Sequence, residues 1–125
     1  MRVLHTDSAP AAIGPYSQAV LCDGWLYCSG QIALDPRSGS IAGDTAREQA
    51  QHVLKNLASV LEAGGAGMDR VVKTTIYLAD MGDFAAVNAV YAEFFGDAPP
   101  ARACVEVSAL PKGVNVEVDA VATVS

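Results

Sequence analysis

Apolar and polar residues alternate along two stretches near the start of the chain, on either side of Asp23-Gly24. That dipeptide favours a two-residue type I′ turn, so residues 16–31 are predicted to form a β-hairpin in which Cys22 lies opposite Trp25. The register gathers polar and aromatic side chains on one side, namely Tyr16, Gln18, Tyr27 and Ser29. The other side is mostly apolar and is expected to face the core, with Ala19, Leu21, Leu26 and Cys28.

Two later stretches repeat apolar residues every three or four positions, which predicts two helices. The first opens on the capping-box pattern Thr45-x-x-Glu48 and stops at Gly64-Gly65. Its apolar residues are Ala46, Ala50, Val53, Leu54, Leu57 and Leu61. The second is expected to have Asp83 as its N-cap and to end before Gly96, with Asn88 close to an apolar stripe. That stripe comprises Phe84, Val87, Tyr91, Phe94 and Phe95.

The remaining regular pattern is that of strands. Val71 to Ala79 is rich in β-branched residues and is predicted to be a strand, with one side formed by Val72, Thr74, Ile76 and Leu78. Residues 101–109 and 115–124 predict a closing hairpin joined through Pro111-Lys112-Gly113. Placing the apolar faces of these two strands together leaves a polar set on the other side: Arg102, Cys104, Glu106, Asn115, Glu117 and Asp119.

This order of elements predicts an α+β fold, with a mixed sheet and both helices on one of its faces, in a single domain that spans residues 1–125. The second face of the sheet has no helix to cover it. A symmetric oligomer would cover that face. The side chains expected there are Tyr16, Ser29, Arg102, Cys104 and Glu117.

Composition supports contacts between subunits and argues against two classes of partner. Hydrophobic residues make up 51% of the chain, charged residues 18%, and the mean hydropathy is +0.26. That is apolar for a small domain, whose surface is large relative to its volume. The net charge of -6 opposes attraction to nucleic acids and to anionic membranes, so neither is expected as a partner.

The cysteines predict neither a disulfide framework nor a metal site. Cys22, Cys28 and Cys104 are odd in number and follow no zinc-binding spacing. The first residues lack the apolar core of a signal peptide, and no stretch approaches the roughly 20 apolar residues of a membrane span. A reducing, cytoplasmic location is therefore expected.

Three segments of the chain carry a family resemblance. They are APAAIGPYSQAV from Ala9, YCSGQIALDPRSG from Tyr27 and VVKTTIYLADMGDFAAVNAVYAEFFGDAPPARACVEVSALPKGVNVEV from Val71. These segments resemble the RidA/YjgF/UK114 family of enamine and imine deaminases. Residues 100–107, followed by residues 116–118, are similar to the family's signature and are more specific than any short motif.

The resemblance implies a chorismate-mutase-like subunit that assembles as a homotrimer around a central barrel, with sites between neighbouring subunits. It also implies a 2-iminobutanoate/2-iminopropanoate deaminase, a hydrolase of C–N bonds that needs neither metal nor cofactor. Its substrates would be 2-aminoacrylate and 2-aminocrotonate with their imine tautomers, which leave pyridoxal-phosphate enzymes that dehydrate serine or threonine. The products would be 2-oxo acids and ammonia.

Position by position, Arg102 matches the family's carboxylate-binding arginine, and Glu117 matches the acid associated with the hydrolytic water. The other matched pocket residues are Tyr16, Ser29, Asn88 and Cys104. The chemistry agrees, because a guanidinium binds a carboxylate through two parallel hydrogen bonds and a carboxylate can move protons to and from water. A neighbouring Arg102 is expected to lower the pKa of Glu117.

Plainer interpretations of these residues stay open. Taken alone, Arg102 suits a surface ion pair and Glu117 a cross-strand partner for a basic residue. Cys104 has no evident histidine base, so covalent catalysis is disfavoured. Tyr16 suits a packing aromatic and Asn88 a loop cap. Whether Glu117 acts as a base or only positions water is also open.

Two other functions compete with the deaminase. The first is a non-catalytic or regulatory member of the same fold that binds a small carboxylate through Arg102. The second is a ribonuclease or translation inhibitor, a function attached to some relatives, which the acidic balance of the chain opposes.

Overall fold

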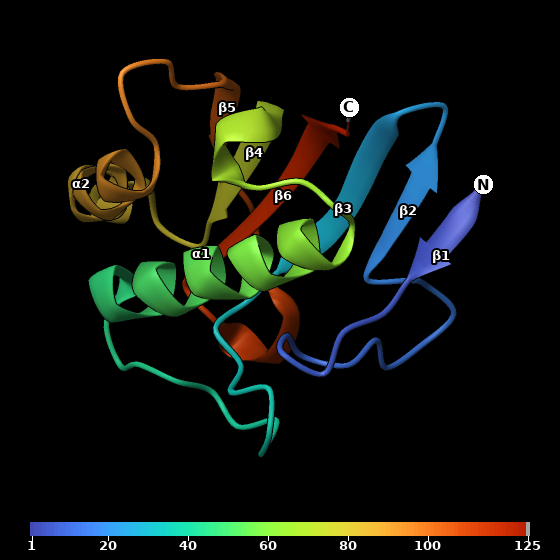
Figure 1. Ribbon diagram of the computed structural model, residues 1–125. Coiled ribbons are helices and arrows are strands. Elements are labelled where there is room, and N and C mark those ends of the chain that lie inside the picture. The colour runs from blue at the N-terminus through green and yellow to red at the C-terminus, as the bar shows by residue number, and fades with distance from the viewer. Residues whose placement is uncertain (125) are drawn as a thin grey trace.

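A computed structural model describes residues 1–124 as one six-stranded sheet with two α-helices (Figure 1). The strands are β1 (Arg2–Leu4), β2 (Ala19–Cys22), β3 (Trp25–Gln31), β4 (Val71–Leu78), β5 (Ala101–Glu106) and β6 (Val116–Thr123). The α-helices are α1 (Ala46–Ala63) and α2 (Phe84–Phe94), and the 3₁₀ turns are η1 (Met68–Arg70), η2 (Met81–Asp83) and η3 (Pro111–Gly113). The sheet order is β1-β2-β3-β6-β4-β5, in which β4 and β5 run parallel and the other neighbours antiparallel.

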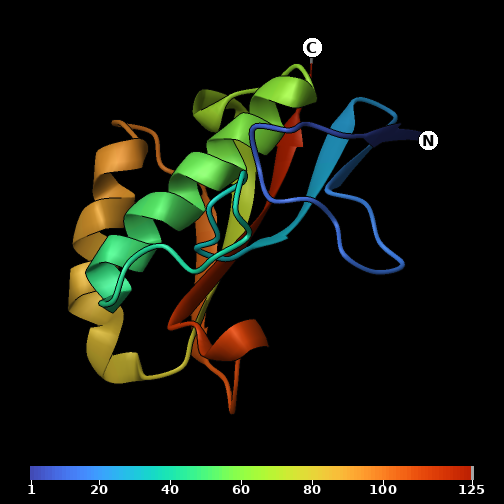
Figure 2. The ribbon, with the colours of Figure 1, turned by 90° about the horizontal axis from the view of Figure 1, so that it is seen from below.

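Both α-helices pack on the same face of the sheet (Figure 2), which confirms the α+β fold with a mixed sheet. The core lies between the sheet and α1, where Leu26 and Val116 of the sheet and Leu57 of the helix are fully shielded from water. Burial of such side chains contributes about 2 kcal/mol each to stability. The opposite face of the sheet, called here the open face, carries no α-helix of residues 1–124.

The β2–β3 hairpin has the predicted turn and register. Asp23 and Gly24 have φ of 51° and 81°, the left-handed values that a type I′ turn requires at both central positions. Cys22 pairs with Trp25, as expected from the sequence. The short strand β1 pairs with β2 and was not among the predicted elements.

The capping box at the start of α1 is also confirmed. The Thr45 hydroxyl accepts the Glu48 N–H at 3.1 Å, and the Glu48 carboxylate accepts the Thr45 N–H at 3.2 Å. The helix ends at Ala63, and Gly65 follows with φ of 84°, where a side chain would be strained. All six predicted apolar positions of this helix are buried.

Two local predictions hold only in part. Asp83 occupies the N-cap position of α2 as predicted, but it is also the last residue of the turn η2, has helical backbone angles and makes no side-chain capping hydrogen bond. Asp80 begins that turn, and its carboxylate accepts the Gly82 N–H at 2.8 Å. In β4, Thr74, Ile76 and Leu78 share the buried side as predicted. An irregular pairing with β6 turns Val71 toward the core and leaves Val72 39% exposed, so the predicted alternation fails at these two residues.

The predicted hairpin of the last two strands is wrong. β5 pairs in parallel with β4, and β6 inserts between β3 and β4, so β5 and β6 are not neighbours. Arg102 is paired with Thr74 and Cys104 with Ile76, two residues that are buried beneath the helices. Glu117 is paired with Tyr77, whose side chain points the other way. Arg102 and Cys104 therefore lie on the helix-covered side, and Glu117 lies on the open face.

The open face is apolar and uncovered over much of its width. Trp25, Tyr27 and Val105 are 41%, 48% and 42% exposed there. Asp119 is also on this face, where its carboxylate accepts the Tyr77 hydroxyl at 2.9 Å. Large exposed aromatic and aliphatic side chains on one sheet face are typical of a protein–protein contact surface.

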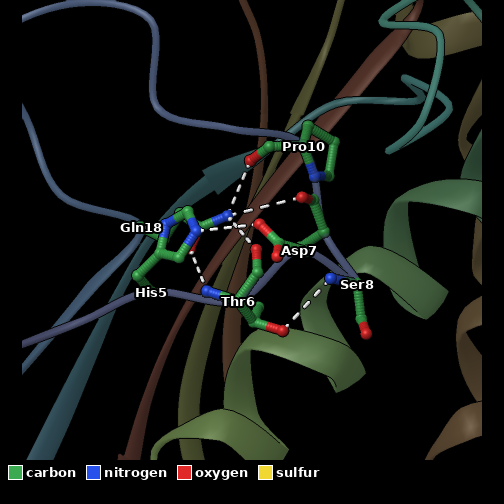
Figure 3. Close-up of polar contacts among 7 residues, drawn as sticks. His5, Thr6, Asp7, Ser8, Pro10 and Gln18 are labelled. Carbon is green, nitrogen blue, oxygen red and sulfur yellow. Dashed lines mark hydrogen bonds and ion pairs between the residues drawn. The ribbon is translucent and has the colours of Figure 1, made fainter.

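Buried amide side chains hold the irregular segments next to the sheet. Gln18, only 3% exposed, donates through Nε2 to the carbonyls of Thr6 at 3.0 Å and Pro10 at 2.8 Å, and its Oε1 accepts the Thr6 N–H at 2.7 Å (Figure 3). Asn56 of α1 similarly donates to the carbonyls of Ile32 and Leu34. Side-chain amides thus supply the hydrogen bonds that these loop backbones do not find in a ladder.

We expect Gln18→Glu to destabilise the fold because it removes the N–H donors and sets a carboxylate against backbone carbonyls. The free energy of unfolding at neutral pH should fall by about 3 kcal/mol, measured by urea denaturation. Gln51→Glu makes the same chemical change on the exposed side of α1 and should stay within about 0.5 kcal/mol of the parent. Equal stability of the two variants would contradict the anchoring role of Gln18.

Candidate functional site

Arg102 lies on the edge strand β5 and contacts three side chains of α2, those of Asn88, Tyr91 and Phe84. Its Nη1 donates to Oδ1 of Asn88 at 2.7 Å. Its guanidinium carbon is 4.9 Å from the ring centre of Tyr91 and 5.6 Å from that of Phe84, both within the range of cation–π attraction. The pairing of Arg102 with Asn88 agrees with their assignment to one site.

The Tyr91 ring is itself held in place by a buried hydrogen bond. The Tyr91 hydroxyl is 2.7 Å from the hydroxyl of Thr74, the buried residue that β4 places opposite Arg102. Burial raises the pKa of Tyr91, so its ring stays a neutral platform for the cation. Arginine has five N–H donors and Asn88 accepts from one, which leaves a planar pair free to bind a carboxylate. Arg102 itself is exposed, beside a groove bordered by Pro99 and Pro100.

Cys104 follows Arg102 on the same side of β5 and packs against the core. Burial raises the pKa of its thiol, although the Arg102 cation opposes this effect. The pKa of Cys28 is raised further, to about 12, chiefly by burial. Both sulfurs are therefore protonated at neutral pH, which argues against a thiolate nucleophile.

Glu117 lies in a separate cavity of about 270 Å³ on the other side of the sheet. Two other polar side chains that line this cavity are Tyr16 and Lys112. The rest of the wall is largely apolar or backbone, with Pro10, Ala11, Ile13, Gly30, Ile32, Leu34 and Pro111, together with the amides of Gln18 and Gln31.

The pKa of Glu117 is raised above its usual range, first by burial and second by the negative charge of Asp119. The expectation that Arg102 lowers this pKa is wrong for the single chain, because the two residues lie on opposite faces of the sheet. A half-buried carboxylate with a raised pKa is suited to taking a proton from water and giving it back.

Tyr16 and Ser29 lie on the Glu117 side. Tyr16 is 52% exposed on the loop before β2 and lines the Glu117 cavity. Ser29 in β3 donates its hydroxyl to the carbonyl of Ser17 at 2.5 Å, so it holds the loop that carries Tyr16. The expected pocket residues thus form two groups, one around Arg102 and one around Glu117, and the cavities lined by Arg102 and by Glu117 are separate.

The sequence analysis missed three residues of the Glu117 cavity. Gly30 has no side chain to suggest a role, and Gln18 was noted only for its strand face. Lys112 has a positive φ of 58°, which is rare for a residue with a side chain and often marks a functional loop. Its position between Pro111 and Gly113 in a turn was the available signal.

Over residues 1–124, no group of three or more His, Cys, Asp and Glu side chains has an arrangement that could hold a metal ion. Among the helices of that same range, none combines the length and apolar character needed to cross a membrane.

Comparison with known proteins identifies the family. Residues 6–124 match the family model described as endoribonuclease L-PSP. The chain is 53% identical to a RutC family protein of Synechocystis, with 98% of this chain and 95% of that protein covered. It is 50% identical to human 2-iminobutanoate/2-iminopropanoate deaminase, with 97% and 88% covered.

Solved structures agree with the sequence comparison. The crystal structure of RidA from Psychrobacter sp. PAMC 21119 superposes with a TM-score of 0.96 at 39% identity, over 99% of this chain and 100% of that one. Escherichia coli TdcF with bound serine superposes with a TM-score of 0.95 at 38% identity, over all of both chains. The chain therefore belongs to the RidA/YjgF/UK114 family that its sequence resembles, the family whose model is described as endoribonuclease L-PSP.

Proposed function

We propose that this protein hydrolyses short 2-imino acids, such as 2-iminopropanoate and 2-iminobutanoate and their enamine tautomers, to 2-oxo acids and ammonia. The observation that carries the proposal is the preset Arg102 guanidinium, held by Asn88 and two aromatic rings with N–H groups to spare. Such a group is suited to a small α-carboxylate. Relatives at 50% identity, the human and mouse proteins among them, are named for this reaction.

Arg102 binds the substrate carboxylate in this proposal and thereby fixes the position of C2. A bidentate ion pair sets both the direction and the plane of the bound carboxylate. Imines of this kind already hydrolyse in water, so orientation and charge placement can supply the acceleration. Cofactor chemistry is not required for this step.

Glu117 handles the protons. The carboxylate accepts a proton from water as the water oxygen forms a bond to C2 and the C=N π electrons move to nitrogen. Glu117 passes that proton to the nitrogen, which gives the neutral carbinolamine. Glu117 then transfers the hydroxyl proton to the amino nitrogen, the C–N bond breaks with its electrons leaving on ammonia, and the oxygen lone pair forms the C=O of the 2-oxo acid. The raised pKa of Glu117 lies closer to neutral pH than that of an ordinary glutamate, which favours both accepting a proton and returning it.

The working unit in this proposal is a homotrimer whose sites lie between subunits, each with Arg102 from one copy and Glu117 from the next. A ring of head-to-tail contacts joins two different surfaces, as the separate positions of Arg102 and Glu117 require. The uncovered apolar residues of the open face supply contact area for such an assembly.

Two other functions are addressed by the same experiments. A protein that only binds small carboxylates would use Arg102 and not Glu117, and the TdcF structure with bound serine is a relative with a small carboxylate ligand. A ribonuclease, the activity in the family model's description, would need attraction to RNA that a net charge of -6 opposes.

The first test supplies the enamine with a threonine dehydratase and traps the imine with semicarbazide. We expect the purified protein to divert the imine to 2-oxobutanoate, and Arg102→Lys to lower kcat/KM about 10- to 100-fold because the planar donor pair is lost. Arg47→Lys, on the exposed first turn of α1, is the matched control and should be neutral. An inactive protein that still binds 2-oxobutanoate through Arg102 would support the carboxylate-binding alternative.

The second test is the pH dependence. Catalysis needs ionised Glu117, so kcat/KM should fall with acid through a pKa above the usual glutamate value, and Asp119→Asn should move that limb to lower pH. Since the folded state holds this proton more tightly, Glu117 costs stability as pH rises through the same window. Glu117→Gln should lower kcat about 10²- to 10⁴-fold because the proton-transfer group is lost. Its free energy of unfolding at pH 7 should be equal to or higher than that of the parent, because the cost of the buried charge is removed. Loss of stability in Glu117→Gln would contradict this electrostatic assignment.

The third test asks whether one site uses two copies. Arg102→Ala and Glu117→Gln proteins, each inactive alone, are co-expressed with different tags and the mixed oligomers isolated. Each mixed trimer should then have both intact residues at one of its three sites, so activity should return to about one third of that of the parent. Mixed oligomers without activity would show that the two groups do not act together between copies.

A further inference from the structure

Strand β3 carries an irregularity beside the Glu117 cavity. Cys28 pairs with Ala120 and Gln31 pairs with Val118, so Ser29 and Gly30 together face the single residue Asp119. Two residues against one define a β-bulge, which bends the strand and changes the direction of the side chains on it. Bulges of this kind are frequent next to active sites.

The bulge is held firmly. The Ser29 N–H donates to the carbonyl of Gln18 at 2.9 Å, the Ser29 hydroxyl donates to the carbonyl of Ser17 at 2.5 Å, and the Gln31 amide donates to the carbonyl of Ser29 at 3.3 Å. Gln18 is itself anchored by the buried hydrogen bonds described above. The backbone at residue 30 is therefore not free to move aside.

Glu117 occupies the space where a side chain at residue 30 would be. A Cβ built on Gly30 would lie 2.8 Å from Cδ of Glu117 and 3.1 Å from its Cγ, and its nearest contact would be Oε2 of the carboxylate. Real Cβ atoms essentially never approach another heavy atom so closely. The φ of Gly30 lies outside the left-handed region, so its glycine is not required by backbone conformation.

Glu117 also meets a negative charge along its own strand. Asp119 lies two residues away on the same face of β6 and is fixed by the Tyr77 hydroxyl. Its charge opposes ionisation of Glu117. A displaced Glu117 carboxylate would therefore move away from the strand toward water and not toward Asp119.

We infer that Gly30 is a positioning residue: the absence of a side chain at this bulge leaves the space that the Glu117 carboxylate occupies and so directs the carboxylate across β3 and into the cavity. The role in catalysis rests on the proposed deaminase function, whereas the placement of Glu117 does not. Gly30→Ala disturbs Glu117 in preference to the fold, because the flexible carboxylate can shift and the anchored backbone cannot.

The kinetic test compares Gly30→Ala with Gly67→Ala. Gly67 is a matched control outside the site, since its added Cβ would also press on a flexible carboxylate, at 2.9 Å from Oδ1 of Asp69. We expect Gly30→Ala to lower kcat about 10- to 100-fold, as a misplaced proton-transfer group does, with unfolding midpoints within the error of the parent. Gly67→Ala should leave kcat unchanged.

A double-mutant cycle separates positioning from simple blocking of the cavity. If Gly30 acts through Glu117, the variant Gly30→Ala/Glu117→Gln should be no slower than Glu117→Gln alone. If the new methyl group instead obstructs the substrate, the losses should multiply and KM should rise. Multiplicative losses would overturn the inference.

A titration gives a readout that does not depend on activity. With ¹³C in the side-chain carboxyls of glutamate, the Glu117 signal is identified as the one missing from Glu117→Gln. In Gly30→Ala we expect its pKa to fall toward the usual glutamate range as the carboxylate enters water, with no change in Gly67→Ala. An unchanged Glu117 titration in Gly30→Ala would refute the positioning role. If the parent protein is inactive but the Glu117 pKa still falls in Gly30→Ala, the proposed deaminase activity is refuted and the positioning role of Gly30 is retained.

Discussion

The parallel pairing of β5 with β4 is the constraint on which the arrangement of the site depends. β6, the last strand in sequence, lies on the other side of β4, so the strands that carry Arg102 and Glu117 are separated by a third. Paired residues in a sheet point to the same face, and this sets Arg102 with Thr74 and Glu117 with Tyr77. The Arg102 guanidinium and the Glu117 carboxylate therefore lie on opposite faces of the sheet, and a change of side-chain rotamer cannot bring them together.

Arg102 and Glu117 are held by different interactions, each suited to the role proposed for the residue. Arg102 keeps its access to water and gains order from Asn88 and the Tyr91 ring, which lowers the entropy lost when a carboxylate binds. Glu117 is instead half-buried beside Asp119. Burial and the Asp119 charge disfavour its ionised form and raise its pKa, which suits a group that exchanges a proton. A binding group benefits from order, whereas an acid–base group benefits from a pKa moved toward the working pH.

Features that depend on neighbouring residues were predictable from the sequence, and those that depend on distant partners were not. The Asp23-Gly24 turn and the Thr45–Glu48 capping box follow from local stereochemistry, and both are present as predicted. The placement of β5 was not predictable in this way, because Ala103 and Val105 make an apolar row that fits either face of a sheet. The prediction assumed that the apolar row faces the helices, whereas here the open face is apolar too.

The candidate site shows the same division. Family resemblance identified Arg102, Asn88, Glu117 and Tyr16 as candidate site residues. The strand pattern then predicted that Arg102 and Glu117 share one face of the same chain, whereas they lie on opposite faces. The contribution of Gly30 was beyond a pattern argument, since it consists of space that another strand's side chain fills. Bulges escape detection for a related reason, because they interrupt the alternation on which strand predictions rest.

In the proposed oligomer, assembly and acid–base chemistry are linked through the open face. Glu117 and Asp119 sit among apolar side chains that are still in contact with water in the single chain. Covering that face with another copy removes water and raises the pKa of Glu117 further, whereas a guanidinium brought by that copy lowers it. The two effects have opposite signs and arise at the same contact. The balance that sets the pH range of the reaction is therefore a property of the proposed oligomer, with Gly30 and Asp119 fixing where in that contact the carboxylate lies.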